Sequence, residues 1–180
     1  MIKGAKNRID QEIYHRTRLA EVSFCKVFQS MQLLNYTVLY YDFDFDKEDI
    51  KKFNENLRTN NENLTREMFF EQEDRILKDY NFSCEKAAKD FPLRAKIKMI
   101  GKMPKRMSDW DVSLGNAKDA IETCLLLFLN EFTTTWKKSS EDVQVYWNSF
   151  VSNSMNYANG MTDEFVVKYF KDEIDLDITV

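Results

Sequence analysis

The chain has 180 residues, of which 43% are hydrophobic, 14% aromatic and 31% charged, and its formal net charge is −4. This composition excludes wholesale disorder, and the acidic balance argues against a generally cationic coat for nucleic acid. The four glycines and two prolines are too few for the many turns of a β-sandwich or barrel, so we expect an all-α fold.

The sequence indicates a soluble, cytoplasmic protein. Its first residues, MIKGAKNRIDQE, lack the apolar stretch of a signal peptide. The longest apolar run, 124–129, is far shorter than the roughly 20 residues of a membrane span. The three cysteines are widely separated and form no CxxC pair, which favours reduced thiols over a disulfide or a zinc site.

The first predicted element is one long helix over 9–41. Apolar or small residues recur there at alternating spacings of three and four, which is a helical stripe. They are Ile9, Ile13, Thr17, Ala20, Phe24, Val27, Met31, Leu34, Val38 and Tyr41. The run YTVLYY has strand propensity, but the stripe continues through it. Such a helix would be about 50 Å long, so it either crosses the domain or pairs with a second copy in a homodimer.

Several later helices share one start signal, a hydrophobic staple around an N-cap. An apolar residue precedes the cap, and a second one follows it four positions on. The signal predicts caps at Asp46, Thr65, Ser108 and Thr162, with Asp49 and Asp111 at the third helical position, while Ser83 and Ser139 also suit a cap. The predicted helices are 47–60, 66–78, 84–99, 109–137, 140–158 and 163–173.

The chain therefore reads as a single helical domain, 1–180. Only Lys138 and Ser139 separate the predicted helices 109–137 and 140–158, so these two should form an antiparallel αα-hairpin. A terminal helix over 163–173 follows this C-terminal hairpin. Pro92 should end or kink the helix over 84–99, and 99–108 is the predicted hinge.

The sequence predicts no catalytic, cofactor-binding or metal-binding site, and we expect the protein not to be an enzyme. The acid-rich stretch 42–49 does not match a calcium loop, and two of its residues, Asp46 and Asp49, are explained as helix caps. His15 is the only histidine, and a surface position is expected for it rather than a catalytic one. Phosphate-binding glycine loops are absent from the sequence. A magnesium site made of carboxylates alone stays open.

The strongest charge feature is the stretch 91–108, FPLRAKIKMIGKMPKRMS, which holds six bases and no acid. These bases are Arg94, Lys96, Lys98, Lys102, Lys105 and Arg106. Together with the adjacent Trp110, which could stack on a base, they are candidate contacts for a partner or for nucleic acid. An alternative of equal weight is a purely structural role, either as a solvated face or as an internal partner of the acidic tail 162–180.

Four stretches, VLYYDFDFDKEDIKKF, YNFSCEKAAKDFPLRAKIKM, IETCLLLFLNEF and YANGMTDEFVVKYFKDE, resemble short helical accessory proteins of bacterial phages and mobile elements. The resemblance implies a protein that acts by binding in the cytoplasm of a bacterial host. Its first implied function is inhibition of a host defence factor such as a CRISPR–Cas nuclease, in the manner of an anti-CRISPR protein. The alternative is a DNA- or RNA-binding accessory protein of phage replication or transcription. A third reading is an enzyme with a carboxylate metal site.

Overall fold

The computed structural model describes residues 3–101 and 104–176, and 84% of the structure is helical with no strand in these ranges. This result confirms the all-α fold class. The helices are α1 (Lys3–Asp42), α2 (Lys47–Asn63), α3 (Arg66–Tyr80), α4 (Cys84–Asp90), α5 (Leu93–Ile100), α6 (Met107–Thr134), α7 (Ser140–Ala158) and α8 (Asp163–Ile174).

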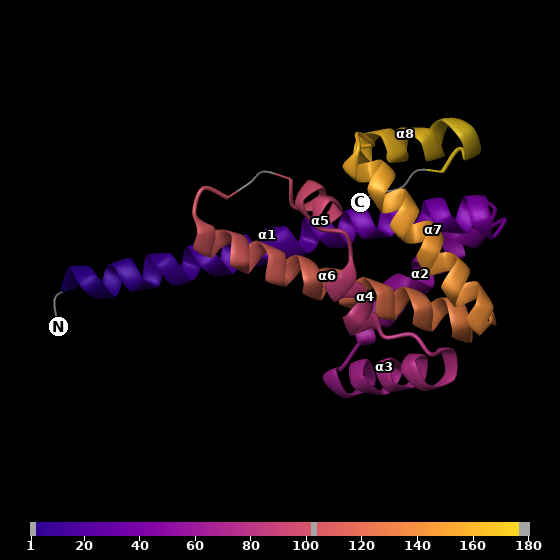
Figure 1. Cartoon of the computed structure of the whole chain (residues 1–180), viewed down its shortest axis with the longest axis horizontal. Helices are drawn as coiled ribbons and strands as arrows, with labels where there is room; N and C mark the ends of the chain where they lie inside the picture. Colours follow the sequence, from indigo (N-terminus) through magenta and orange to yellow (C-terminus); the bar gives the residue numbers. More distant parts are fainter. Residues whose placement is uncertain (1–2, 102–103, 177–180) are drawn as a thin grey trace.

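The long helix α1 and the apolar helix α6 form the centre of the molecule (Figure 1). α1 runs unbroken through YTVLYY, as its stripe predicted. Met31, Leu34 and Val38 of this stripe are fully buried, and so are Ile121 and Leu125 of α6. The two helices run in the same direction, and their buried faces form the core on which the other helices pack.

The remaining helices cover this pair from several sides. α2, α3 and α4 pack on α6, whereas α7 and α8 pack on α1, and α5 contacts α1, α6 and α7. Phe53 of α2, Phe128 of α6 and Tyr146 of α7 join these layers, with ring centroids 4.7 Å apart for Phe53–Phe128 and 4.6 Å for Phe128–Tyr146. Aromatic contacts of this kind add specific geometry to the burial of a large apolar area.

Five of the predicted N-caps are confirmed and one is wrong. The side chains of Asp46, Thr65, Ser83, Ser139 and Thr162 each accept a hydrogen bond from the backbone N–H three residues on. Ser108, in contrast, lies inside the first turn of α6, which begins at Met107. The predicted staple fails there because Met107 is 78% exposed.

Two of the predicted helices have other bounds in the structure, and local backbone features explain both differences. The predicted helix 84–99 is divided at Phe91 and Pro92 into α4 and α5, as proline's missing N–H requires. The helix predicted over 109–137 ends at Thr134, because Lys137 adopts a left-handed φ of 53°. This bend brings the Trp136 ring to 4.4 Å from the Phe45 ring.

The predicted hairpin of α6 and α7 takes a more open form. The link covers 135–139, and the helices meet through Tyr146, whose ring lies 4.6 Å from Phe128 and 5.7 Å from Phe132. Farther along, α7 diverges and packs mainly on α1 and α5. The longer link permits this crossing, which a two-residue link would not.

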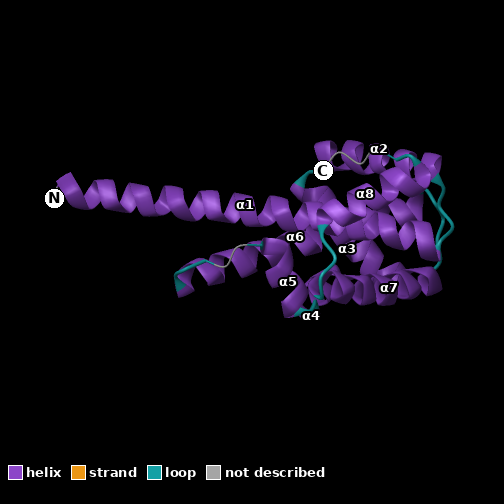
Figure 2. Cartoon of the chain, turned by 90° about the horizontal axis from the view of Figure 1, so that it is seen from above, coloured by secondary structure: helices purple, strands orange, loops and turns teal. Residues whose placement is uncertain are grey.

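The first half of α1, residues 3–22, points away from the core as a rod, and its first turns lie beyond all the other helices (Figures 1 and 2). This segment is called the projecting half below. Its Ile9 and Ile13 are each 59% exposed and its Tyr14 is 67% exposed, although the two isoleucines continue the stripe that is buried farther along. In the described part of the chain, no helix has the length and apolar character of a membrane span.

The N-cap of α7 at Ser139 can be tested by substitution. Replacing Ser139 with alanine removes the cap hydroxyl of α7 and should lower the free energy of unfolding by about 1 kcal/mol, measured by urea denaturation at pH 7. Hydrogen bonds from the Ser139 backbone and hydroxyl lower the pKa of Asp142. The stability that these bonds contribute to the folded protein is therefore present at pH 7 and is lost as acid protonates Asp142. Ser108→Ala is the matched control and should change stability by less than about 0.5 kcal/mol. Equal losses in the two variants would contradict the observed start of α6.

Because Ile9 and Ile13 remain exposed, the homodimer expected from the sequence stays a prediction. Burial of Ile9 and Ile13 against a second copy should give a dimer in multi-angle light scattering, and Ile13→Lys should shift it toward monomer because a lysine would be desolvated there. A wild-type protein that stays monomeric over a hundredfold range of concentration would rule this pairing out.

Candidate functional site

A groove lies where α1 leaves the bundle, between its residues 8–26 and the residues 100 and 104–109 that lead into α6. Its volume is about 820 Å³. The α1 side is lined by residues 8, 11, 12, 15, 19, 22, 23 and 26, which recur at helical spacing and so share one face. The opposite wall consists of Ile100, Pro104, Lys105, Arg106 and Asp109.

The groove is positively charged although the protein as a whole is acidic. Its lining cations are Arg8, Lys26, Lys105 and Arg106, and its lining anions are Glu12 and Asp109. With His15 neutral, this leaves an excess of two positive charges. The cations come from two segments about 80 residues apart in the sequence, so only the fold brings them together.

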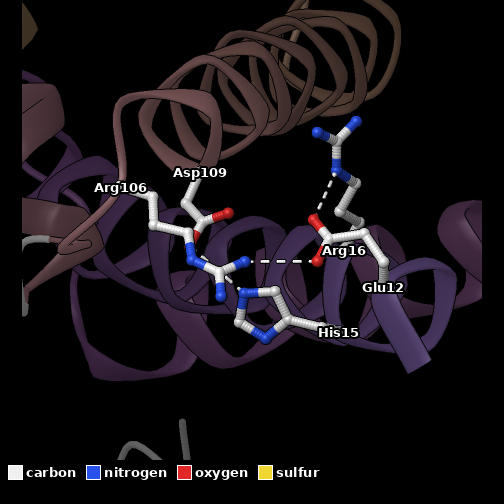
Figure 3. A network of polar contacts seen from close by, with 5 residues as sticks. All are labelled: Glu12, His15, Arg16, Arg106 and Asp109. Atoms are coloured by element: carbon white, nitrogen blue, oxygen red, sulfur yellow. Dashed lines mark hydrogen bonds and ion pairs between the residues drawn. The ribbon is translucent and has the colours of Figure 1, made fainter. Parts of the chain in front are cut away.

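One ion pair and one hydrogen bond join the walls of the groove (Figure 3). Glu12 accepts from Arg106 across the groove at 3.2 Å, and its other oxygen accepts from Arg16 of the same helix at 3.2 Å. Nε2 of His15 lies 3.2 Å from Oδ2 of Asp109. These contacts fix the segment that enters α6 against the projecting half of α1.

The two carboxylates of this network have different surroundings. The side chain of Asp109 is only 7% exposed, and its Oδ1 has no hydrogen-bond partner among the described residues. Glu12, in contrast, is 43% exposed. A buried carboxylate with one unsatisfied oxygen depends strongly on the partner it does have, whereas an exposed one exchanges readily with water.

The described ones among the predicted basic residues do not form one patch; they are Arg94, Lys96, Lys98, Lys105 and Arg106. Lys105 and Arg106 line the groove, but Arg94 is exposed outside its lining. Lys96 is only 8% exposed, its ammonium donates to the carbonyl of Lys89 at 3.1 Å, and burial lowers its pKa. Lys96 therefore faces inward and is not placed to touch a partner.

The other predicted contacts lie elsewhere. Lys98 is exposed, and its charge is one cause of the lowered pKa of Glu164, after hydrogen bonds from the Glu164 backbone and the Thr162 side chain. Trp110 is half-buried and is not in the groove lining. Lys102 is outside the described residues, as is part of the predicted hinge 99–108, so both stay predictions.

The acidic tail forms its ion pair with a different base. Asp175 accepts from Lys47 of α2 at 2.8 Å, and this contact is the main cause of the lowered pKa of Asp175. Among the described residues, the charge of Lys98 acts on Glu164 of the tail, whereas Lys105 and Arg106 line the groove.

Sequence reasoning missed most of the α1 wall. Arg8, Glu12, His15 and Lys26 were not grouped, although their spacings of four, three and eleven place them on one helical face. That spacing was the available signal. The partner of His15 had no signal, because Asp109 is 94 residues away.

Within residues 3–101 and 104–176, no group of three or more His, Cys, Asp or Glu is placed to hold a metal ion. Comparison with family models, curated proteins and solved structures found no match for this chain. The groove is therefore interpreted from its own chemistry.

The link between His15 and Asp109 can be measured by a double-mutant cycle. His15→Ala leaves the buried carboxylate of Asp109 without its described partner, so we expect a loss of about 1 kcal/mol in the free energy of unfolding. Asp109→Ala should remove most of the additional effect of His15→Ala, because the two changes share one interaction. Additive effects of the two substitutions would show that the pair contributes nothing.

Proposed function

We propose that this protein acts by binding, as an accessory protein of a phage or mobile element, and that its groove binds the phosphate backbone of single-stranded nucleic acid. The observation that carries the proposal is the convergence of Arg8, Lys26, Lys105 and Arg106 on one groove of an otherwise acidic protein. Lysine and arginine side chains that neutralise phosphates supply most of the sequence-independent affinity for nucleic acid.

The dimensions favour a single strand over a duplex. The 820 Å³ of the groove fall within the range of about 300–1,000 Å³ typical of clefts for small ligands. A few nucleotides of a flexible single strand fit a volume of this size. A duplex is too wide to enter the groove and would contact only its rim. Single-strand binders combine such a cationic groove with flat side chains for base stacking, and the half-exposed ring of His15 lies in the lining.

A second candidate is inhibition of a host defence factor such as a CRISPR–Cas nuclease. The observation that favours it is the projecting half of α1, whose exposed Ile9, Ile13 and Tyr14 offer an apolar helix face. An amphipathic helix can dock into a groove of a protein partner through such a face. A pull-down from a bacterial lysate that yields one stoichiometric nuclease would support this candidate.

The nucleic-acid proposal is tested by removing the charges of Lys105 and Arg106 together. Lys105→Gln/Arg106→Gln should weaken binding of a fluorescein-labelled 12-nucleotide DNA roughly tenfold in anisotropy titrations at low salt, and should make the log–log salt dependence shallower by about 1.4. Oligonucleotides of different sequence should be affected alike, because phosphates carry no sequence information.

The matched control is Arg94→Gln/Lys98→Gln, which removes the same charge from the same segment outside the groove. Its affinity should stay close to that of the wild-type protein. Equal weakening in both double variants would show that net charge, and not the groove, determines binding. Absence of binding by the wild-type protein at low salt would end the nucleic-acid proposal.

A further inference from the structure

Glu12 lies where an oxyanion ligand of the groove would be expected. Its two oxygens accept hydrogen bonds from two different guanidinium groups, Arg16 on its own helix and Arg106 at the start of α6 (Figure 3). Guanidinium groups bind carboxylates and phosphates through the same directed N–H donors. The position between Arg16 and Arg106 is thus an oxyanion site that the protein fills with its own side chain.

The contacts of Glu12 are loose. Both N···O distances are 3.2 Å, longer than the roughly 2.7–2.9 Å of strong charge-assisted hydrogen bonds. The side chains of Glu12, Arg16 and Arg106 are 43%, 50% and 64% exposed, so water solvates all three charges. Exposed pairs of this kind contribute little to stability, and little free energy is needed to separate them.

The neighbouring carboxylate cannot be displaced in the same way. Asp109 is buried, one of its oxygens has no described partner, and His15 holds the other. Moving Asp109 would break its hydrogen bond with His15, one of the two polar contacts between the walls. Of the two acids in the lining, only Glu12 is placed to give up its partners to a ligand.

We infer that Glu12 stands in for a phosphate group, and that Arg16 and Arg106 form a phosphate-binding subsite at the rim of the groove. When a strand binds, its phosphate replaces the Glu12 carboxylate on the two guanidiniums, and Glu12 turns into solvent. This inference rests on the proposed function. It also assigns a binding role to Arg16, which is not part of the groove lining.

The Glu12 carboxylate should weaken the binding of a phosphate to Arg16 and Arg106. Glu12 neutralises part of the cationic lining in the free protein, so a ligand gains the two arginines only after displacing it. A carboxylate beside a bound phosphate is also repelled by it. Removing the charge of Glu12 should therefore tighten binding, whereas removing the charge of a distant acid should not.

The experiment measures binding of the same fluorescein-labelled 12-nucleotide single-stranded DNA by anisotropy at several NaCl concentrations. Glu12→Gln should bind roughly fivefold more tightly than the wild-type protein, and its log–log salt dependence should stay close to that of the wild-type protein because the same phosphates are contacted in both. Glu21→Gln is the matched control: it removes the same charge from the same helix at an exposed position outside the groove lining.

A third variant identifies the arginines as the cause. Adding Arg16→Gln to Glu12→Gln should cancel the gain in affinity, because the subsite then lacks one of its two guanidiniums. Thermal unfolding of each variant confirms the fold, which the exposure of these side chains leaves intact.

Equal effects of Glu12→Gln and Glu21→Gln would overturn the inference in favour of a general charge effect. Weaker binding by Glu12→Gln would overturn the inference too, because Glu12 would then stabilise the shape of the groove that the ligand needs. In both cases the proposed function stands, since the wild-type protein binds. Failure of the wild-type protein and of every variant to bind would instead refute the proposed function, and this inference with it.

Discussion

α1 is longer than the bundle it belongs to. Its 40 residues extend about 60 Å at 1.5 Å per residue. From residue 8 on, where side-chain burial is described, the first buried residue is Ser23. The second half is held by the core that it shares with α6. The first half has no core, and the segment 104–109 folds back against it through polar side chains. The groove is a direct consequence of this mismatch in length.

The two halves of α1 are therefore stabilised very differently. The second half buries residues such as Met31, Leu34 and Val38, each worth roughly 1.5–3 kcal/mol on burial. The projecting half is joined to α6 by the His15–Asp109 hydrogen bond, in which only Asp109 is buried, and by the exposed Glu12–Arg106 ion pair. A hydrogen bond or an exposed ion pair contributes only about 1 kcal/mol. Binding elements are commonly drawn from such weakly held regions, so the same helix can anchor the fold and adapt to a ligand.

Local patterns predicted the helices well and the site only in part. The stripe of α1 and the caps at Asp46 and Ser139 act over a few residues, and the sequence shows them directly. The inward turn of Lys96 and the pairing of His15 with Asp109 depend on how α1, α5 and α6 pack, which no local pattern encodes. Ser108 was misplaced as a cap because its predicted staple relied on Met107, a residue that the fold leaves in solvent.

The central claim is that the projecting half of α1 and the entry to α6 together bind a single strand. Amide hydrogen–deuterium exchange, with and without a saturating 12-nucleotide DNA, tests it most directly because it reports on every helix at once. The account predicts slower exchange in 8–26 and 104–113 and no change in α3 or α8. Protection confined to other helices, or none in these two segments while the DNA is bound, would contradict it.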